Sequence, residues 1–219
     1  MAPPPANALA NYHLTYVNDF NQTHLPRGWY PFTGVAGGDP TDQFSAHHLI
    51  VAQGLLRLKT YRDPSNSNAW TTAGLCQCGR PFTYGAVFVR SRQIGSAVNS
   101  AELLWPNDNS WPPEIDFNED LFRTKFTTAT IHWTGNQTNF HVLKIDVSRW
   151  HTYGVVWTPL FILFTVDGRP WHEFAVPTSI PHQPMNVDFE QRVNCPSPKY
   201  CPRQPSALLI DWLVEYKHN

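Results

Sequence analysis

The chain has 219 residues, of which 42% are hydrophobic and 15% are charged, and its formal net charge is −1. This balance predicts a folded protein with a sizeable core and argues against a disordered chain. Without a basic stretch or a long apolar run, the sequence predicts no nucleic-acid partner and no membrane partner. The first residues lack the features of a signal peptide, so an extracellular location is an expectation inferred from other features.

Strand-like alternation, interrupted by Gly, Pro and Asn, recurs along the whole chain, and helical periodicity is scarce. Together with 20 prolines, this pattern predicts an all-β fold, a sandwich of two antiparallel sheets in a single domain spanning 1–219. The dipeptide Asp167-Gly168 predicts a tight hairpin. The expected strands are 14–19, 55–60, 84–92, 114–119, 126–133, 152–157, 161–166, 170–174 and 208–216.

The last expected strand, 208–216, has the clearest alternation. Side chains two residues apart on a strand share a face. The pattern therefore predicts one apolar face and one face that carries Asp211 and Glu215. The predicted apolar face consists of Leu208, Ile210, Trp212, Val214 and Tyr216.

The four cysteines fall into two pairs along the sequence. Cys195 and Cys201 flank a proline-rich loop and are a plausible disulfide. A direct bridge between Cys76 and Cys78 would be strained in a strand-like segment, so these two are expected to pair with the others or to stay reduced. Zinc binding is disfavoured because the Cys-x-Cys spacing is too short for the usual structural site.

The segment 103–119 carries the candidate chemistry, with acids at Glu114, Asp116 and Glu119. On a strand, Glu114 and Asp116 share one face, while Ile115 and Phe117 point to the core. Glu119 is at an odd offset from Glu114, but one β-bulge near Asn118 would return it to the same face. The spacing therefore predicts three carboxyl groups in one short row.

Such a row suits cleavage of a glycosidic bond. A retaining mechanism needs one carboxylate as nucleophile and a protonated carboxyl as acid, roughly 5–5.5 Å apart. A third acid between them would raise the pKa of the proton donor. The alternative is that 110–119 begins a helix capped by Ser110. The strand is favoured because no amphipathic run follows, and because 126–133 alternates with Thr128, Thr130 and His132 on one face.

The segment Glu114-Ile-Asp-Phe-Asn-Glu119 resembles the Glu-x-Asp-x-x-Glu signature of glycoside hydrolase family 16. Other segments resemble strands of that family in the expected order, and they cover most of the chain. The preceding Trp-Pro pairs, at Trp105 and Trp111, resemble the laminarinase-type branch. The remaining matching segments are 82–90, 150–158, 166–168 and 210–216.

The resemblance implies a β-jelly-roll with a concave substrate cleft and a retaining endo-acting hydrolase of β-1,3-glucan or mixed β-1,3/1,4-glucan. It implies Glu114 as nucleophile, Asp116 as the assisting carboxylate and Glu119 as acid/base. Trp105 and Trp111 would stack on sugars, although core packing is an equally good reading of either residue alone. His132 would reach the leaving-group side or be a buried, hydrogen-bonded histidine. The chain departs from the family at Asn118, where an apolar residue is common, and at Pro112-Pro113.

No cofactor is expected for catalysis. The resemblance suggests a structural calcium site, as in many members of the family, with Gly54 and Asp211 at the matching positions. One carboxylate and one carbonyl are few ligands for calcium.

A monomer that binds a β-linked polysaccharide is expected. The alternatives are a β-galactan hydrolase of the agarase or carrageenase kind, a transglycosylase of the same family, and a non-catalytic polysaccharide-binding jelly-roll.

Overall fold

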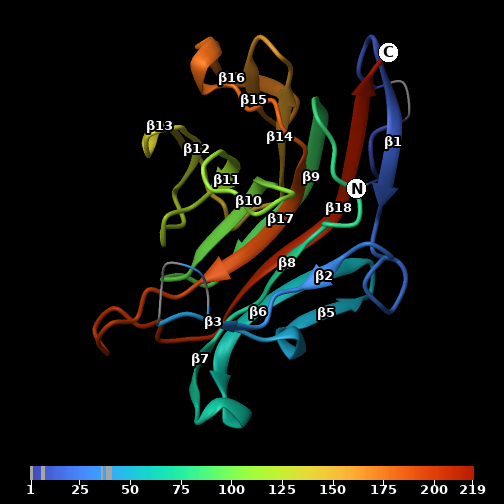
Figure 1. Ribbon diagram of the computed structural model, residues 1–219. Helices are drawn as coiled ribbons and strands as arrows, with labels where there is room; N and C mark the ends of the chain where they lie inside the picture. Colours follow the sequence, from blue (N-terminus) through green and yellow to red (C-terminus); the bar gives the residue numbers. More distant parts are fainter. Residues whose placement is uncertain (1, 6–7, 36, 38–40) are drawn as a thin grey trace.

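A computed structural model describes residues 2–5, 8–35, 37 and 41–219, and the regular secondary structure of these residues consists almost entirely of antiparallel strands. In the described part of the chain, the first large sheet has nine strands. Its main path is β16 (Arg169–Phe174), β15 (Ile162–Val166), β14 (His151–Trp157), β9 (Gly85–Ile94), β18 (Ser206–His218), β6 (Leu55–Asp63) and β5 (Leu49–Ala52). Two further strands, β1 (Tyr12–Asn18) and β7 (Ala69–Thr71), pair with β18 and β6. Figure 1 shows β1 running beside β18.

The second large sheet has seven strands in the same described residues. Their order is β13 (Gln137–Lys144), β12 (Phe126–Trp133), β11 (Glu114–Glu119), β10 (Asn99–Pro106), β17 (Met185–Arg192), β8 (Gly74–Cys76) and β2 (Tyr30–Pro31). The small elements are β3 (Gly34–Val35), β4 (Gln43–Phe44) and the short 3-10 turns η1 (Ala46–His48), η2 (Pro64–Asn66) and η3 (Pro177–Ser179). None of the described helical segments is long and apolar enough to cross a membrane.

The main core lies between the two sheets. Ile115 and Phe117 of β11 and Val187 and Phe189 of β17 are fully buried there. The first sheet contributes residues such as Val87 and Val89 of β9 and Leu208, Ile210 and Leu213 of β18. The prediction of an all-β sandwich of two antiparallel sheets is therefore confirmed.

The expected strands are all present, with ends that shift by one to three residues. The strands β11 and β12 have the predicted bounds. The alternative of a helix from Ser110 is wrong, because 114–119 pairs with neighbours on both sides. The predicted hairpin joins β15 to β16, with Asp167 and Gly168 at φ of 51° and 75°, as a two-residue turn of this kind requires.

The predicted apolar face of β18 is wrong in its second half. The pairing of β18 with β9 shifts between Ile210 and Trp212, which is a bulge at Asp211. One extra residue exchanges the two faces of a strand. Beyond the bulge, Trp212, Val214 and Tyr216 therefore join a second apolar cluster on the outer face, while Leu213 enters the main core. Glu215, two residues after Leu213, faces the interior side and is buried.

The structure contains the disulfides Cys195–Cys201, as expected, and Cys76–Cys78. The expectation that Cys76 and Cys78 do not bridge directly is wrong. The strand β8 ends at Cys76 and the chain turns, which brings the two Cα atoms to 5.1 Å, within the usual range for a disulfide. The two bridges leave no free thiol among the four cysteines.

Candidate active site

A β-bulge in β11 aligns the three predicted acids. The pairing with β10 changes register between Glu102 and Leu103, and the pairing with β12 changes between Asp116 and Glu119. The extra residue lies at Phe117–Asn118, as predicted. Glu119 therefore lies on the same sheet face as Glu114 and Asp116, opposite the core; we call this the acid face.

The acid face continues across the neighbouring strands. In register with the acids on β12 lie His132, Thr130 and Thr128, beside Glu114, Asp116 and Glu119 respectively. This agrees with the predicted polar face of 126–133. Farther out on β13, Phe140 and Val142 pair with Thr130 and Thr128, and their side chains are exposed.

Glu114 is held by Trp111 at the edge of the acid face. The Trp111 indole Nε1 donates a hydrogen bond of 2.7 Å to Glu114 Oε2. Its ring lies 5.7 Å from the His132 ring and is 46% exposed. Trp111 is therefore available to a ligand, and core packing is excluded for it. Burial and the Asp116 charge raise the pKa of Glu114 to about 9, while His132 and the Trp111 hydrogen bond act in the opposite direction.

Asp116 is the deepest of the three acids. Its side chain is almost fully buried. Its Oδ2 lies 3.6 Å from His132 Nε2, and the other ring nitrogen of His132 is 2.8 Å from the Thr138 hydroxyl. Burial, reinforced by the charge of Glu119, raises the pKa of Asp116 well above its ordinary value. The half-exposed His132 thus lies on the acid face in contact with Asp116.

Glu119 is held by Asn99, a residue that the sequence did not single out. Asn99 Nδ2 donates a 2.8 Å hydrogen bond to Glu119 Oε1. Its Oδ1 accepts from the backbone N–H of Leu121 at 2.8 Å, which fixes the amide orientation. Burial raises the pKa of Glu119, while the Asn99 hydrogen bond lowers it. Asn99 therefore both orients Glu119 and stabilises its ionised form.

The strand β17 adds a second polar row that the sequence analysis also missed. Asn186, Asp188 and Glu190 pair with Trp105, Leu103 and Ala101 of β10, so they share the acid face. Glu190 accepts two hydrogen bonds from Arg192, at 2.7 and 3.3 Å. The signal was available, because polar residues alternate along 185–192 with the buried Val187 and Phe189.

Trp105 lies on the same face at the end of β10. It is partly buried, and its Nε1 donates a 3.2 Å hydrogen bond to Asn109 Oδ1. This bond holds the indole against the 107–110 turn, between β10 and Trp111. Both tryptophans that were expected beside the acids are therefore near the row, one at each end of this connecting segment.

Gly54 and Asp211, the two positions matched to a structural calcium, come close together in the fold. The pairing of Ile210 with Leu56 places Asp211 near the β5–β6 turn that contains Gly54. The Asp211 carboxylate, however, accepts a 2.8 Å hydrogen bond from Arg90 Nη1. Among the described residues, no group of three or more Asp, Glu, His or Cys could hold a metal. These ligands are too few for calcium, which takes six to eight oxygens, and the calcium site stays an untested prediction.

The three acids form one titrating unit. Their pKa values are all raised by burial, and neighbouring carboxyls add to the effect. Because they interact, protons leave the set stepwise and belong to the group as a whole. A set of interacting carboxyls that has lost some but not all of its protons can supply an ionised nucleophile and a proton donor together. This is the combination that cleavage of a glycosidic bond requires.

Comparisons with known proteins show which family and which proteins the chain is similar to. The family model described as glycosyl hydrolases family 16 matches residues 39–196. The endo-1,3-1,4-beta-glycanase ExsH of Rhizobium meliloti is 38% identical over 142 residues, which are 61% of this chain and 30% of that protein. EglC of the same organism, another endo-1,3-1,4-beta-glycanase, is 29% identical over 205 residues, 78% of this chain and 44% of the relative. The chain thus spans less than half the length of these two relatives.

Solved structures share the fold at low sequence identity. The catalytic domain of an endo-1,3-beta-glucanase (laminarinase) from Thermotoga petrophila superposes with a TM-score of 0.82 at 18% identity, covering 96% of this chain and all of that one (100%). The laminarinase from Rhodothermus marinus gives a TM-score of 0.82 at 20% identity, covering 94% and 97% of the two chains. The expected β-jelly-roll is confirmed.

Proposed function

This chain belongs to glycosyl hydrolase family 16, and from that premise we propose that it cleaves internal bonds of a β-1,3-glucan or a mixed β-1,3/1,4-glucan with retention. The observation that carries the proposal is the bulge that places Glu114, Asp116 and Glu119 in one row, next to the exposed ring of Trp111. The relatives described as endo-1,3-1,4-beta-glycanases support the substrate class.

In the proposed reaction, the Glu114 carboxylate attacks the anomeric carbon while the protonated Glu119 donates its proton to the departing oxygen. A covalent glycosyl-enzyme forms, and the departing chain leaves as an alcohol. Glu119, now ionised, then takes a proton from water, which attacks the same carbon and releases Glu114. Asp116 lies between the two glutamates, and its charge raises the pKa of Glu114. Trp111 and His132, whose rings lie 5.7 Å apart beside Glu114, offer a flat ring and a polar edge to a sugar bound there.

The electrostatics of the acid face favour a neutral polysaccharide. Asp188 and Glu190 add two carboxyls beside the three of β11, and Arg192 is engaged by Glu190. A sulfated galactan needs cationic partners, and the Arg192 guanidinium beside the acid face is already engaged by Glu190. The carrageenase-like alternative is therefore disfavoured. A neutral galactan such as agarose has to be distinguished from a glucan by an activity assay on both polymers.

An extracellular site of action fits the two disulfides, which form and persist in oxidising compartments. We propose a secreted, monomeric domain. Its location is tested by fractionating the source cells and probing the medium with an antibody against the domain. Its oligomeric state is measured by light scattering.

The activity is tested by measuring new reducing ends on laminarin, mixed-linkage β-glucan, agarose and carrageenan. The variant Glu114→Gln, which is expected to be inactive, is the negative control. Release from laminarin or mixed-linkage glucan supports the proposal, and NMR of the first product should show the β-anomer. Release from agarose alone would show that the substrate is a β-galactan and not a β-glucan. No release from any polymer, with the folded protein retained on immobilised glucan, would instead favour the binding module.

A further inference from the structure

A hollow separate from the acid face lies where the chain crosses from β8 in one sheet to β9 in the other. It has a volume of about 370 Å³ and is lined by residues of β1, β18 and the 79–84 segment. None of its described lining residues belongs to β10, β11 or β12, which carry the acid row and Trp105. Its size falls at the lower end of small-molecule sites, which measure about 300–1,000 Å³.

The floor of the hollow is a buried carboxyl, Glu215. The bulge at Asp211 turns this residue to the inner side of β18, where only 5% of it is exposed. Its Oε1 atom is buried without a hydrogen-bond partner among the described residues. Buried polar atoms are nearly always hydrogen-bonded, and an unpaired one points to a missing ligand or water. Burial raises the pKa of Glu215 to about 7, while the neighbouring Gln77 amide and the Arg80 charge oppose that rise.

A second buried group beside Glu215 has the same shortage of partners. Gln77 is fully buried between the bridged Cys76 and Cys78, and apart from the Glu215 carboxyl, whose pKa it lowers, its amide has no hydrogen-bond partner in the described structure. A carboxyl and a carboxamide, one next to the other, therefore both retain unused hydrogen-bonding capacity. Together they can accept and donate several hydrogen bonds.

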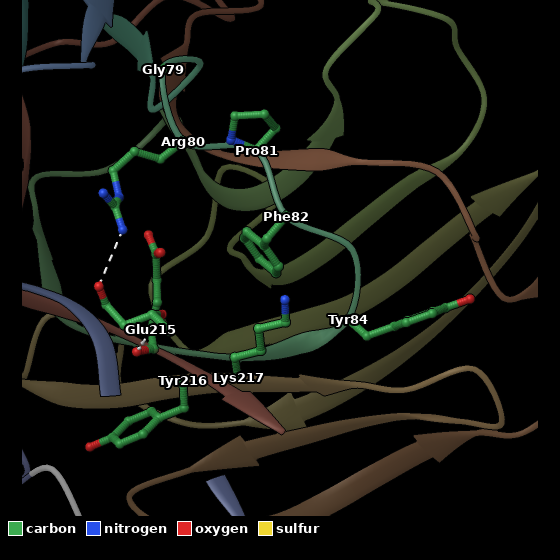
Figure 2. Close-up of a pocket in the computed structure, with 9 residues that line it drawn as sticks. Gly79, Arg80, Pro81, Phe82, Tyr84, Glu215, Tyr216 and Lys217 are labelled. Carbon is green, nitrogen blue, oxygen red and sulfur yellow. Dashed lines mark hydrogen bonds between the residues drawn. The ribbon is translucent and has the colours of Figure 1, made fainter. Parts of the chain in front are cut away.

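The walls combine two cations with aromatic rings. Figure 2 shows Glu215 and Lys217 extending from β18 toward Phe82, with Arg80 opposite and Tyr216 pointing away. Arg80 is fixed, because its guanidinium lies 4.6 Å above the Tyr16 ring and donates a 3.2 Å hydrogen bond to the Thr15 carbonyl. The exposed Lys217 leaves the mouth of the hollow open to solvent.

We propose that this hollow binds one neutral pyranose unit of an oligosaccharide, at a site separate from the acid row. A metal cation would meet Arg80 and Lys217, and a small anion would meet Glu215. A neutral ring of hydroxyl groups satisfies both kinds of wall, because each hydroxyl both donates and accepts hydrogen bonds. Its apolar face can lie on Phe82. The inference does not depend on the roles proposed for Glu114 and Glu119.

The test is a titration of the ¹⁵N-labelled full chain carrying Glu114→Gln with laminaritriose, followed through backbone amide shifts. Saturable shifts at Gly79, Arg80 and Lys217 are expected. The substitutions Lys217→Ala and Glu215→Gln should each weaken binding at these amides by about tenfold, as expected for loss of a hydrogen bond to a charged group. The matched control is Lys199→Ala, another exposed lysine, in the Cys195–Cys201 loop.

The two proposals fail in distinguishable ways. Shifts near Trp111 without shifts at Gly79 and Lys217 overturn the second site and leave the proposed function in place. Shifts at Gly79 and Lys217 without shifts near Trp111 support the second site and count against a glucan on the acid face. Shifts that are unchanged in both Lys217→Ala and Glu215→Gln overturn the second site. Amide spectra and melting temperatures of each variant verify that it is folded.

Discussion

The indole of Trp111 donates its N–H to Glu114 Oε2 at 2.7 Å. Besides the flat surface that Trp111 is proposed to offer a sugar, its hydrogen bond lowers the pKa of the Glu114 carboxyl. A hydrogen bond to the charged form of an acid stabilises that form. The exposed ring of Trp111 thus also favours the ionised state that Glu114 needs in its proposed role as nucleophile.

The first prediction separates these two roles of Trp111. Trp111→Phe keeps a flat ring and removes the N–H donor, so the pKa of Glu114 should rise. Because the nucleophile must be ionised, the acidic limb of the kcat/KM profile should move to higher pH. The measurement is kcat/KM on laminarin from pH 4 to 9. A profile that is lowered uniformly, without a shift of that limb, would show that Trp111 acts by stacking alone.

The second prediction identifies the nucleophile chemically. Glu114→Ala should lower turnover of an aryl β-glucoside by at least about 10³-fold, because no covalent intermediate can form. Sodium azide should then restore turnover and give the α-glycosyl azide, since azide attacks from the face that Glu114 vacates. The same treatment of Glu119→Ala should give the β-azide. Glu173→Gln, an exposed acid on β16, is the control, and a β-azide from Glu114→Ala would contradict the assignment.

Much of the site could be predicted because its acids are close together in the sequence. The odd offset of Glu119 from Glu114 required a bulge, and the structure has it at Phe117–Asn118. The bulge at Asp211 was not predicted. Every second residue from Leu208 to Tyr216 is apolar, so the pattern gives no sign of a register change. The register change becomes understandable in the folded structure, where Trp212 and Tyr216 are buried in the outer apolar cluster.

Residues that support the acids from other strands could not be found in this way. Asn99 lies 20 residues before Glu119, and nothing in its local sequence indicates that the two meet. The structure also explains why a polar residue, Asn118, stands where the family commonly has an apolar one. Its Oδ1 accepts a 2.6 Å hydrogen bond from Thr127, and it lies opposite Glu102 on β10. These contacts depend on the pairing of strands, which a single sequence does not specify.

The third prediction concerns Asn99. Asn99→Ala removes the hydrogen bond that lowers the pKa of Glu119, so that pKa should rise. Because the acid must be protonated for the first step, the basic limb of the kcat/KM profile should move to higher pH. The lost contact with Leu121 N–H should also lower the melting temperature. Asn99→Asp keeps an acceptor for Leu121 and serves as the comparison. An unchanged basic limb in Asn99→Ala would exclude Asn99 from control of the acid.

The fourth prediction rests on Glu102, which is fully buried behind the bulge. Burial raises its pKa to about 8, and the nearby Ser91 and Asn118 side chains only partly oppose this. The folded protein therefore holds a proton on Glu102 at pH values where the unfolded chain has lost it. Between the unfolded pKa, about 4.5, and the folded pKa, the native state binds more protons. The free energy of unfolding must then fall as pH rises through this window.

Glu102→Gln should remove that contribution, because the amide does not titrate and has nearly the same shape. Urea unfolding at pH 5 and pH 8 measures the effect. The free energy of unfolding of the wild type should fall by on the order of a few kcal/mol more than that of the variant. The raised pKa values of the acid row also favour the folded state at low pH, but they are present in both proteins and cancel in the difference. Glu173→Gln, which replaces an exposed acid, should keep the wild-type dependence. Equal slopes for wild type and Glu102→Gln would mean that Glu102 is ionised in the folded protein at neutral pH.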